Sequence, residues 1–342
     1  MSSTAKGYID ADGHVRDGDQ QYRKYLEAPY HKRQSIMVGG DSFDRQMFGT
    51  LGGPRQLEAQ GWLDILDAGG VETTVLYPTG GLSVGFINEP DFAVAFCRAY
   101  NNYITEEFVK VSPRLKAVAI LPLQDPQEAA RELTRAVTEL NLVGAMLPAD
   151  GPYLLGKSSV DPIYAEAERL GTMLAIHAGG SLRGRGLDEY LFDRFLQAHI
   201  LSHSGAQMRQ MTSIILEGVP ERFPNVRLAF LEAGCTWVPY WMDRMDEEFE
   251  FRGAQEAPVL TKKPSEYVRD INVYVACEPE EQLLPEAMRI IGPDNIVFAS
   301  DYPHWDGSFP QSLRELEARQ DLSEADKTKI LVHNPRRLYS LQ

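Results

Sequence analysis

Short apolar runs rich in β-branched residues alternate along the chain with longer segments whose apolar residues recur at helical spacing. The segment 127–140 shows the helical pattern, because Ala129, Leu133, Val137 and Leu140 fall on one face. Such alternation is typical of parallel βα units. We predict strands at Tyr8–Asp12, Thr73–Tyr77, Ala117–Leu121, Val143–Leu147, Met173–His177, Arg227–Glu232, Ile271–Val275 and Ile296–Asp301.

This succession predicts a (β/α)8 TIM barrel, with residues 1–342 forming a single domain. The rival is an open doubly wound sheet, which normally carries a glycine-rich phosphate turn after its first strand, whereas this turn reads DADGHV. Two connections are too long for a single crossover: Val15 to about Arg55 after strand 1, and Ala178 to Phe223 after strand 5. Such insertions lie at the active-site face of a barrel, so we expect both to wall or roof a pocket.

Composition narrows the class of protein. Of the 342 residues, 43% are hydrophobic and 24% are charged, which provides a large core and excludes disorder and coiled coils. The formal net charge of −15 argues against nucleic acid as a partner, because the protein's overall field repels polyanions. Three scattered cysteines favour a reducing compartment, and no apolar run reaches the roughly 18 residues of a membrane span. We expect a cytoplasmic location and no membrane partner.

Acidic residues and histidines cluster at the carboxyl ends of the predicted strands. Because side chains alternate along a strand, Asp12 and His14 point the same way. Carboxylates brought together at a barrel rim would repel one another unless a cation neutralised them, so the pattern predicts a metal centre. Taken singly, each of these residues is more often a capped or solvated polar group. The strand-end residues are Asp10, Asp12, His14, His177, Glu232 and Asp301, with His304 directly following.

Further candidates lie in the insertion after strand 5 and beyond strand 8. His199 and His203 are four residues apart, which places both on one helix face where they could chelate or merely pack; we prefer His203 as a ligand. Arg183 and Arg185 could hold a carboxylate or phosphate of a substrate, or be solvated loop charges. Trp305 could line an apolar pocket or belong to the core.

Five segments, spread over nearly the whole chain, carry a resemblance to a known family: YIDADGHV, LAIHAGG, ERFPNVRLAFLEAGCTWVPYWMDRMDE, VFASDYPHWD and HNPRRLY. They resemble the amidohydrolase superfamily, specifically the branch related to aminocarboxymuconate-semialdehyde decarboxylase. The resemblance implies a (β/α)8 metalloenzyme with ligands at Asp12, His14, His177 and Asp301. It also implies a homo-oligomer or a complex with a related subunit.

Two positions depart from the family pattern. Decarboxylases and hydrolases of the family usually have His-x-His at strand 1, whereas this chain has Asp12-Gly13-His14. They usually place a histidine at the end of strand 6 as the acid/base beside the metal, whereas this chain has Glu232. The setting of His203, HxxxQM, resembles the pattern of members that share this glutamate variant.

The candidate ligands outnumber what one ion with an open site can use: Asp12, His14, His177, His203, Glu232, Asp301 and His304. We therefore expect two divalent metal ions, iron and/or manganese, with zinc as the alternative. A carboxylate-rich pair of sites tolerates changes of oxidation state and leaves positions for dioxygen. A few superfamily members resemble this description and act as oxygenases.

These observations favour a dinuclear non-haem monooxygenase that hydroxylates a small organic or carboxylate/thioester substrate, with Glu232, His203 and Asp301 as catalytic residues. The alternative is a hydrolase that uses a metal-bound hydroxide, with Glu232 or His203 as the base. A decarboxylase is less favoured because the strand-6 histidine is missing. A non-catalytic scaffold is less favoured because the donor set is complete.

Overall fold

The computed structural model describes residues 6–36, 57–179, 192 and 194–342. All strand pairings are parallel, in the order β1-β2-β3 and β4-β5-β6-β7-β8-β9. The strands are β1 (Ile9–Val15), β2 (Thr73–Pro78), β3 (Leu115–Ala117), β4 (Ala119–Ile120), β5 (Gly144–Pro148), β6 (Met173–His177), β7 (Arg227–Leu231), β8 (Val273–Cys277) and β9 (Ile296–Phe298).

Backbone hydrogen bonds join the two sheets into one barrel. Only Val118 separates β3 from β4, and its N–H donates to Leu76 O at 3.2 Å, so β3 and β4 act as one strand. At the other junction, Asp301 N donates to Asp12 O at 2.9 Å and His14 N donates to Tyr302 O at 2.7 Å. The predicted (β/α)8 class is confirmed.

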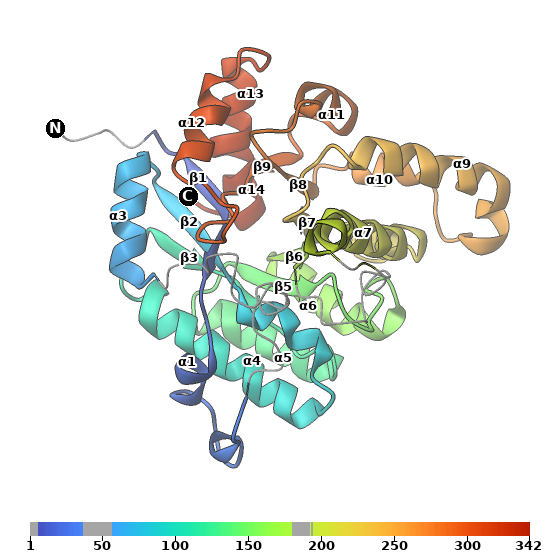
Figure 1. Ribbon diagram of the computed structural model, residues 1–342. Coiled ribbons are helices and arrows are strands. Elements are labelled where there is room, and N and C mark those ends of the chain that lie inside the picture. Colours follow the sequence, from blue (N-terminus) through green and yellow to red (C-terminus); the bar gives the residue numbers. More distant parts are fainter. Residues whose placement is uncertain (1–5, 37–56, 180–191, 193) are drawn as a thin grey trace.

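Helices surround the strands (Figure 1). The α-helices are α1 (Asp19–Arg23), α3 (Ala59–Gly69), α4 (Pro90–Ile104), α5 (Pro126–Thr138), α6 (Asp161–Leu170), α7 (Phe195–Leu216), α8 (Val219–Arg222), α9 (Val238–Glu256), α10 (Pro264–Val268), α11 (Leu284–Ile291), α12 (Gln311–Ala318), α13 (Glu324–Thr328) and α14 (Asn334–Tyr339). Shorter turns are the 3₁₀ helices at Tyr30–Lys32, Gly80–Phe86 and Ser158–Val160 and the π-helices at Thr105–Val109 and Lys329–His333. None of the described helices is long and apolar enough to cross a membrane.

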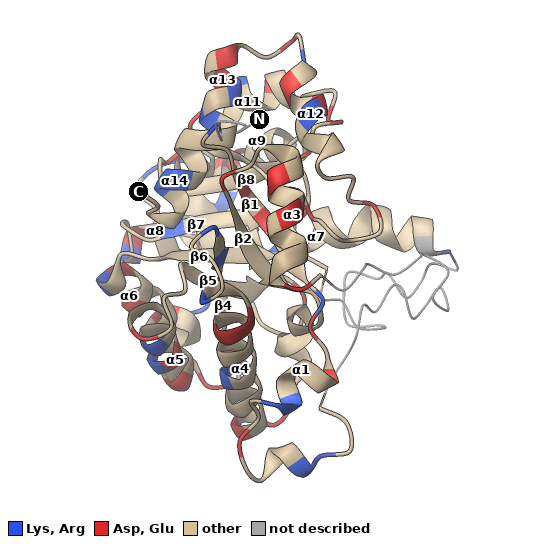
Figure 2. Cartoon of the chain, turned by 90° about the vertical axis from the view of Figure 1, so that its left-hand side faces the viewer, with Lys and Arg blue, Asp and Glu red and all other residues tan. Residues whose placement is uncertain are grey.

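Helix α5 illustrates how local sequence sets an element. The Asp125 side chain accepts hydrogen bonds from Gln127 N and Glu128 N, both at 3.1 Å, which satisfies backbone donors at the helix start. Pro126 suits the first helical position because its missing N–H would have no partner there. Leu133 lies on the buried face, and acidic and basic residues are interspersed along α5 and α6 (Figure 2). The helix therefore covers the barrel with one face and meets solvent with the other.

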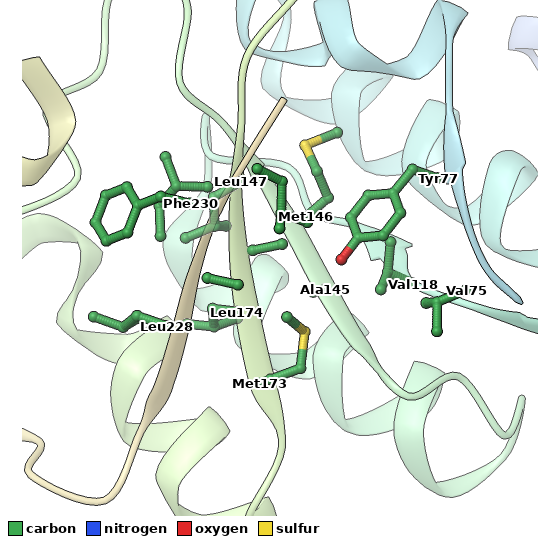
Figure 3. Close-up of a cluster of buried hydrophobic side chains, with 14 of the residues drawn as sticks. Val75, Tyr77, Val118, Ala145, Met146, Leu147, Met173, Leu174, Leu228 and Phe230 are labelled. Atoms are coloured by element: carbon green, nitrogen blue, oxygen red, sulfur yellow. The ribbon is translucent and has the colours of Figure 1, made fainter. Parts of the chain in front are cut away.

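Strands β2, β5, β6 and β8 are buried along their whole length, which explains their largely apolar sequences. Figure 3 shows part of this core, in which side chains of β2, β5, β6 and β7 pack together. The buried set includes Val75, Leu147, Leu174 and Phe230. This packing fixes the strands whose carboxyl ends carry the candidate ligands.

Of the eight predicted strands, only Met173–His177 keeps both bounds in the structure, and three of the differences concern strands that lead into the candidate site. The strand predicted at Ile271–Val275 is β8, Val273–Cys277, because Ile271 is 49% exposed in a turn in which the Asp270 side chain accepts from Asn272 N. Strand β1 continues past Asp12 to Val15, with a register shift between Asp10 and Gly13. Strand β9 ends at Phe298, three residues before the predicted end.

The two insertions are described only in part. In the first, α1 and the turn Tyr30–Lys32 are described, and residues 37–56 lie outside the described part. In the second, α7 and α8 are described, whereas Arg183 and Arg185 lie outside it. That residues 1–342 form one domain stays a prediction.

A buried carboxylate ties the closing strands together. Asp10 on β1 accepts hydrogen bonds from Thr74 Oγ1 at 2.8 Å, Ser300 N at 2.9 Å and Ser300 Oγ at 2.8 Å. Burial raises the pKa of Asp10 to about 6, although these hydrogen bonds favour the charged form. The side chain is therefore an ionised acceptor at neutral pH, linking β1 to β2 and to the segment after β9.

We expect Asp10→Ala to lower the free energy of unfolding by about 2 to 4 kcal/mol, because it leaves buried donors of Thr74 and Ser300 without an acceptor. Urea unfolding followed by circular dichroism measures the change. The control is Asp64→Ala, which removes only an exposed hydrogen bond to Gln60 and should change stability by less than about 0.5 kcal/mol. Equal losses in the two variants would contradict the role of Asp10 in barrel closure.

Candidate metal centre

Strand β1 directs two candidate ligands toward the barrel mouth. The side chains of Asp12 and His14 are both fully buried. Gly13 between them allows close packing, because a Cβ at this position would lie 2.6 Å from both Thr74 Oγ1 and the Trp62 ring. The sequence Asp-Gly-His therefore reflects the space around the strand as well as the need for two ligands.

Asp12 and His14 begin a chain of alternating imidazoles and carboxylates. Asp12 Oδ2 lies 3.1 Å from His177 Nε2, at the end of β6. Asp12 Oδ1 lies 3.4 Å from His14 Nε2, and that nitrogen lies 3.3 Å from Asp301 Oδ1, after β9. Four of the predicted site residues thus converge at the carboxyl ends of three strands.

Two further residues close this chain into a ring. Asp301 Oδ1 lies 2.6 Å from His304 Nδ1, which lies 3.6 Å from Glu232 Oε1. Glu232 Oε2 lies 3.0 Å from His177 Nδ1. We call these six residues the imidazole–carboxylate ring: Asp12, His14, His177, Glu232, Asp301 and His304.

The backbone at Glu232 and Asp301 is unusual. Their φ angles are +59° and +50°, in the left-handed region that residues other than glycine rarely adopt. Each follows directly on a strand end or its extension, where the chain turns sharply. Strain of this kind persists only where surrounding contacts impose it, and it concentrates at functional sites.

Backbone carbonyls orient two of the imidazoles. His14 Nδ1 lies 2.9 Å from Pro78 O and His177 Nδ1 lies 2.8 Å from Ala178 O. Since a carbonyl only accepts, each Nδ1 carries a proton, so that in the neutral form of the ring, which a metal requires, the Nε2 lone pair faces the centre. His304 is held through its other nitrogen, with Nε2 3.0 Å from Thr79 Oγ1.

The ring fits a divalent metal ion. Two sets of potential ligand atoms lie within 4.8 Å of one another: one from Asp12, His14 and His177, the other from His14, Glu232, Asp301 and His304. His14 Nε2 is buried and has no hydrogen-bond partner, as expected for a ligand atom that awaits a cation. Mixed imidazole and carboxylate donors suit manganese, iron or zinc.

Protons take up part of this charge in the metal-free protein. Burial disfavours the charged forms of His177 and His304. The negative charges of Asp12 and Glu232 nevertheless raise the pKa of His177 well above the usual range. Asp301 and Glu232 raise the pKa of His304 in the same way. Burial would also raise the pKa of Glu232, yet the charge of His177 holds it well below the usual range. In the metal-free protein His177 and His304 are therefore protonated and Glu232 is ionised.

Helix α7 brings His203 to the edge of the ring. His203 Nε2 lies 3.7 Å from Glu232 Oε1, and its Nδ1 lies 2.8 Å from Ser202 Oγ. Burial would lower the pKa of His203, but the hydrogen bond and charge of Glu232 raise it to about 9. His199, one turn earlier, packs against His203 with ring centroids 4.8 Å apart, and its Nε2 lies 3.9 Å from Asp306.

A cavity of about 200 Å³ opens beside the ring. Among the described residues, no lysine or arginine lines it. Trp305 is 41% exposed, lies beside His199 and is not among the lining residues. The lining consists of Asp12, His199, Ile200, His203, Ser204, Glu232, Ala233, Gly234, Ala276, Cys277, Glu278, Ala299, Asp301 and Asp306.

Sequence reasoning missed Glu278 and Thr79. Glu278 directly follows β8 and lines the cavity, but the predicted strand ended at Val275, which hid the strand-end position of this carboxylate. Thr79 directly follows β2 and contacts His304, residues far apart in sequence with no spacing pattern to connect them. A correct strand end would have identified Glu278, whereas nothing local pointed to Thr79.

Comparison with known proteins identifies the relatives of this chain. The sequence profile described as Amidohydrolase matches residues 9–341. Gamma-resorcylate decarboxylase of Rhizobium sp. (strain MTP-10005) is 26% identical over 289 residues, 82% of this chain and 86% of that protein. The 2-amino-3-carboxymuconate-6-semialdehyde decarboxylase of Dictyostelium discoideum is 25% identical over 255 residues, 73% of this chain and 68% of that protein.

A solved structure with the same fold is a dihydroxybenzoic acid decarboxylase from Polaromonas sp. JS666 with bound manganese and the inhibitor 2-nitroresorcinol. It aligns with a TM-score of 0.75 and 22% identity, covering 98% of this chain and 97% of that chain. The expectation that a monooxygenase or a hydrolase is favoured over a decarboxylase is wrong, because these relatives are decarboxylases. That expectation rested on the absence of a histidine at the position of Glu232, directly after β7. In the structure, α7 supplies the imidazole of His203 beside Glu232.

We expect Mn²⁺ binding to release protons, because the raised pKa values of His177 and His304 mean that both rings hold protons which a metal must displace. Apparent affinity should fall as the pH is lowered, about tenfold per pH unit for each proton displaced. Isothermal titration calorimetry in buffers of different ionisation enthalpy measures the number released. An affinity that is constant from about pH 6 to about pH 8 would contradict this electrostatic account.

Proposed function

Because this chain belongs to the amidohydrolase family, we propose that it is a metal-dependent decarboxylase of a small organic carboxylate. The observation that carries the proposal is the imidazole–carboxylate ring at the barrel mouth, beside a cavity that a proton-carrying imidazole also lines. The relatives are named for substrates whose carboxylate sits on an aromatic or conjugated carbon. We propose the same class of substrate here, a carboxylate on an unsaturated carbon.

We propose two adjacent divalent ions, with manganese as the first choice. Asp12, His14 and His177 would hold one of them, and Glu232, Asp301 and His304 the other. When bound, the ions would supply positive charge that offsets the carboxylates and attracts an anionic substrate. Charge supports the pair: with neutral imidazoles, the three carboxylates and one divalent ion leave a net negative site, whereas a second ion makes it positive.

His203 is the proposed proton donor. Decarboxylation breaks the bond between the carboxyl carbon and its neighbour; carbon dioxide leaves, and the electron pair remains on the neighbouring carbon, which then takes a proton. The donor must face the cavity and carry a proton at neutral pH. His203 lines the cavity. Burial would lower the pKa of His203, but the nearby carboxylate of Glu232 raises it to about 9 in the metal-free protein.

Glu232 contacts two of the site histidines, His203 and His177. Its Oε1 faces His203 Nε2 at 3.7 Å, so its negative charge favours the protonated form of His203. Its Oε2 lies 3.0 Å from His177 Nδ1, so the same side chain also orients that ligand. Deep burial of Asp12, His14 and His177 keeps bulk water away from this side of the site.

The cytoplasmic location and the oligomeric assembly stay predictions from the sequence.

The first test replaces the proton donor. We expect His203→Asn to lower kcat by about 100-fold or more, because the reacting carbon loses its proton source. The control is His333→Asn, which removes an exposed histidine that does not line the cavity and should leave kcat within about threefold of the parent. The assay follows carbon dioxide release by the manganese-loaded protein from a panel of aromatic and conjugated carboxylates that includes 2,6-dihydroxybenzoate.

The same assay in deuterium oxide should place one deuterium on the carbon that lost the carboxylate. Full kcat in a metal-loaded His203→Asn variant would remove His203 from the proton-transfer role. If no carboxylate of the panel loses carbon dioxide, the proposed function itself is wrong.

The second test concerns the number of metals. We expect Glu232→Gln to lower the bound manganese from near two ions per chain to near one, since it removes a charged ligand while keeping the shape. The control, Glu278→Gln, changes another cavity-lining carboxylate that belongs to neither ligand set among the described residues, and it should keep both ions. Elemental analysis after gel filtration gives the ratio. A parent protein with a single ion would contradict the two-metal proposal.

A further inference from the structure

A buried glutamine on α7 contacts the backbone beside two residues of the imidazole–carboxylate ring. Gln207 has no exposed surface, and its Nε2 donates to Ile176 O at 2.9 Å and to Leu231 O at 2.7 Å. Ile176 directly precedes His177, and Leu231 directly precedes Glu232. One side-chain amide therefore bridges the backbones that carry two of the six ring residues.

The two hydrogen bonds of Gln207 lie at the point where the pairing between β6 and β7 ends. The paired register of β6 and β7 ends at His177 and Leu231. Beyond this point Glu232 adopts its left-handed conformation, which the local backbone does not favour. A donor that holds both carbonyls at the strand ends limits how far the two backbones can separate, and so limits movement of Glu232 relative to His177.

The same residue also relates α7 to the ring. His203 and Gln207 are four residues apart on α7, which places them on the same face of the helix. Because Gln207 attaches this face to the ends of β6 and β7, it also determines how far His203 stands from Glu232, 3.7 Å in the structure. One amide group thus relates His177, Glu232 and His203 to one another.

We propose that Gln207 is a positioning residue, whose amide sets the spacing between the α7 imidazole of His203 and the strand-end residues His177 and Glu232. The inference rests on the proposed function, because it assigns this geometry to proton transfer beside the metal site. Two accepting carbonyls require an NH₂ group with two donors, so neither a carboxylate nor a thioether of similar size can replace the amide.

The chain offers a matched control in Gln210, on the same helix. Gln210 is also fully buried, and its Nε2 donates to two carbonyls, Ala149 O at 2.8 Å and Tyr153 O at 2.9 Å. Its Oε1 accepts from Leu155 N at 3.0 Å. These partners belong to the segment after β5, which carries no residue of the ring. Gln210 therefore fastens α7 to the segment after β5 and makes no hydrogen bond to the residues that directly precede His177 and Glu232, although Ala149 N donates to His177 O at 2.8 Å.

The experiment compares Gln207→Met with Gln210→Met in the manganese-loaded full chain. We expect both variants to unfold at lower urea concentrations, because Gln207→Met loses two buried hydrogen bonds and Gln210→Met loses three. Only Gln207→Met should lower kcat, by about 10- to 100-fold with KM within about twofold, because small displacements of reacting groups have large effects on rate. It alone should also weaken Mn²⁺ binding and alter the electron paramagnetic resonance spectrum of the bound Mn²⁺.

The milder variant Gln207→Asn, which keeps the amide but shortens its reach, gives the same contrast if Gln207→Met is too unstable to load metal. Equal effects of the Gln207 and Gln210 variants on kcat, Mn²⁺ affinity and the spectrum would show that Gln207 only supports the fold, and would overturn the proposal. If the parent decarboxylates nothing in the panel, the proposed function fails, while the Mn²⁺ affinity and spectrum still decide whether Gln207 positions the site.

Discussion

Negative charge held close together at the barrel mouth is the constraint on which the rest of this site depends. Asp12 is fully buried, and Glu232 and Asp301 are 12% and 26% exposed, so water screens them weakly. Each carboxylate has imidazoles as its nearest partners, so the site alternates in sign around a ring. In the metal-free protein, protons on His177, His203 and His304 offset part of the negative charge. Divalent metal would offset it more completely. The raised pKa values of His177, His203 and His304 and the depressed pKa of Glu232 all follow from this one cause.

The scaffold around the ring controls where its lone pairs point. The carbonyls of Pro78 and Ala178 each accept a hydrogen bond from the Nδ1–H of a histidine, which leaves His14 Nε2 and His177 Nε2 facing the centre. Asp10, although an acid two residues from Asp12, serves a different purpose, because its oxygens are occupied by Thr74 and Ser300. Neighbouring acids of one strand thus divide between barrel closure and the site according to the donors that surround them.

The site also explains how a chain related to decarboxylases can have Glu232 after β7, where the family usually has a histidine. An imidazole stands beside Glu232 after all, but it comes from α7 and not from the barrel strand. A helix is attached to the barrel by side chains such as Gln207 and Gln210, so the position of its imidazole depends on those attachments. The absence of one residue type at one position was therefore weak evidence against proton transfer at this site, because another element brings an imidazole to within 3.7 Å of Glu232.

The sequence by itself determined the barrel and the main ring residues, since both follow from periodicity. Parallel strands all end at the same face, and alternation along β1 puts Asp12 and His14 on one side, so strand-end acids and histidines had to converge. Only the tertiary structure decided the contacts between elements that carry no common period: Thr79 with His304, Gln207 with the carbonyls of Ile176 and Leu231, and His203 with Glu232. It also decided that β8 ends at Cys277, which brings Glu278 to the cavity. The physical reason is that local spacing specifies which face a residue occupies, whereas the partner across that face depends on how whole helices and loops pack against the barrel.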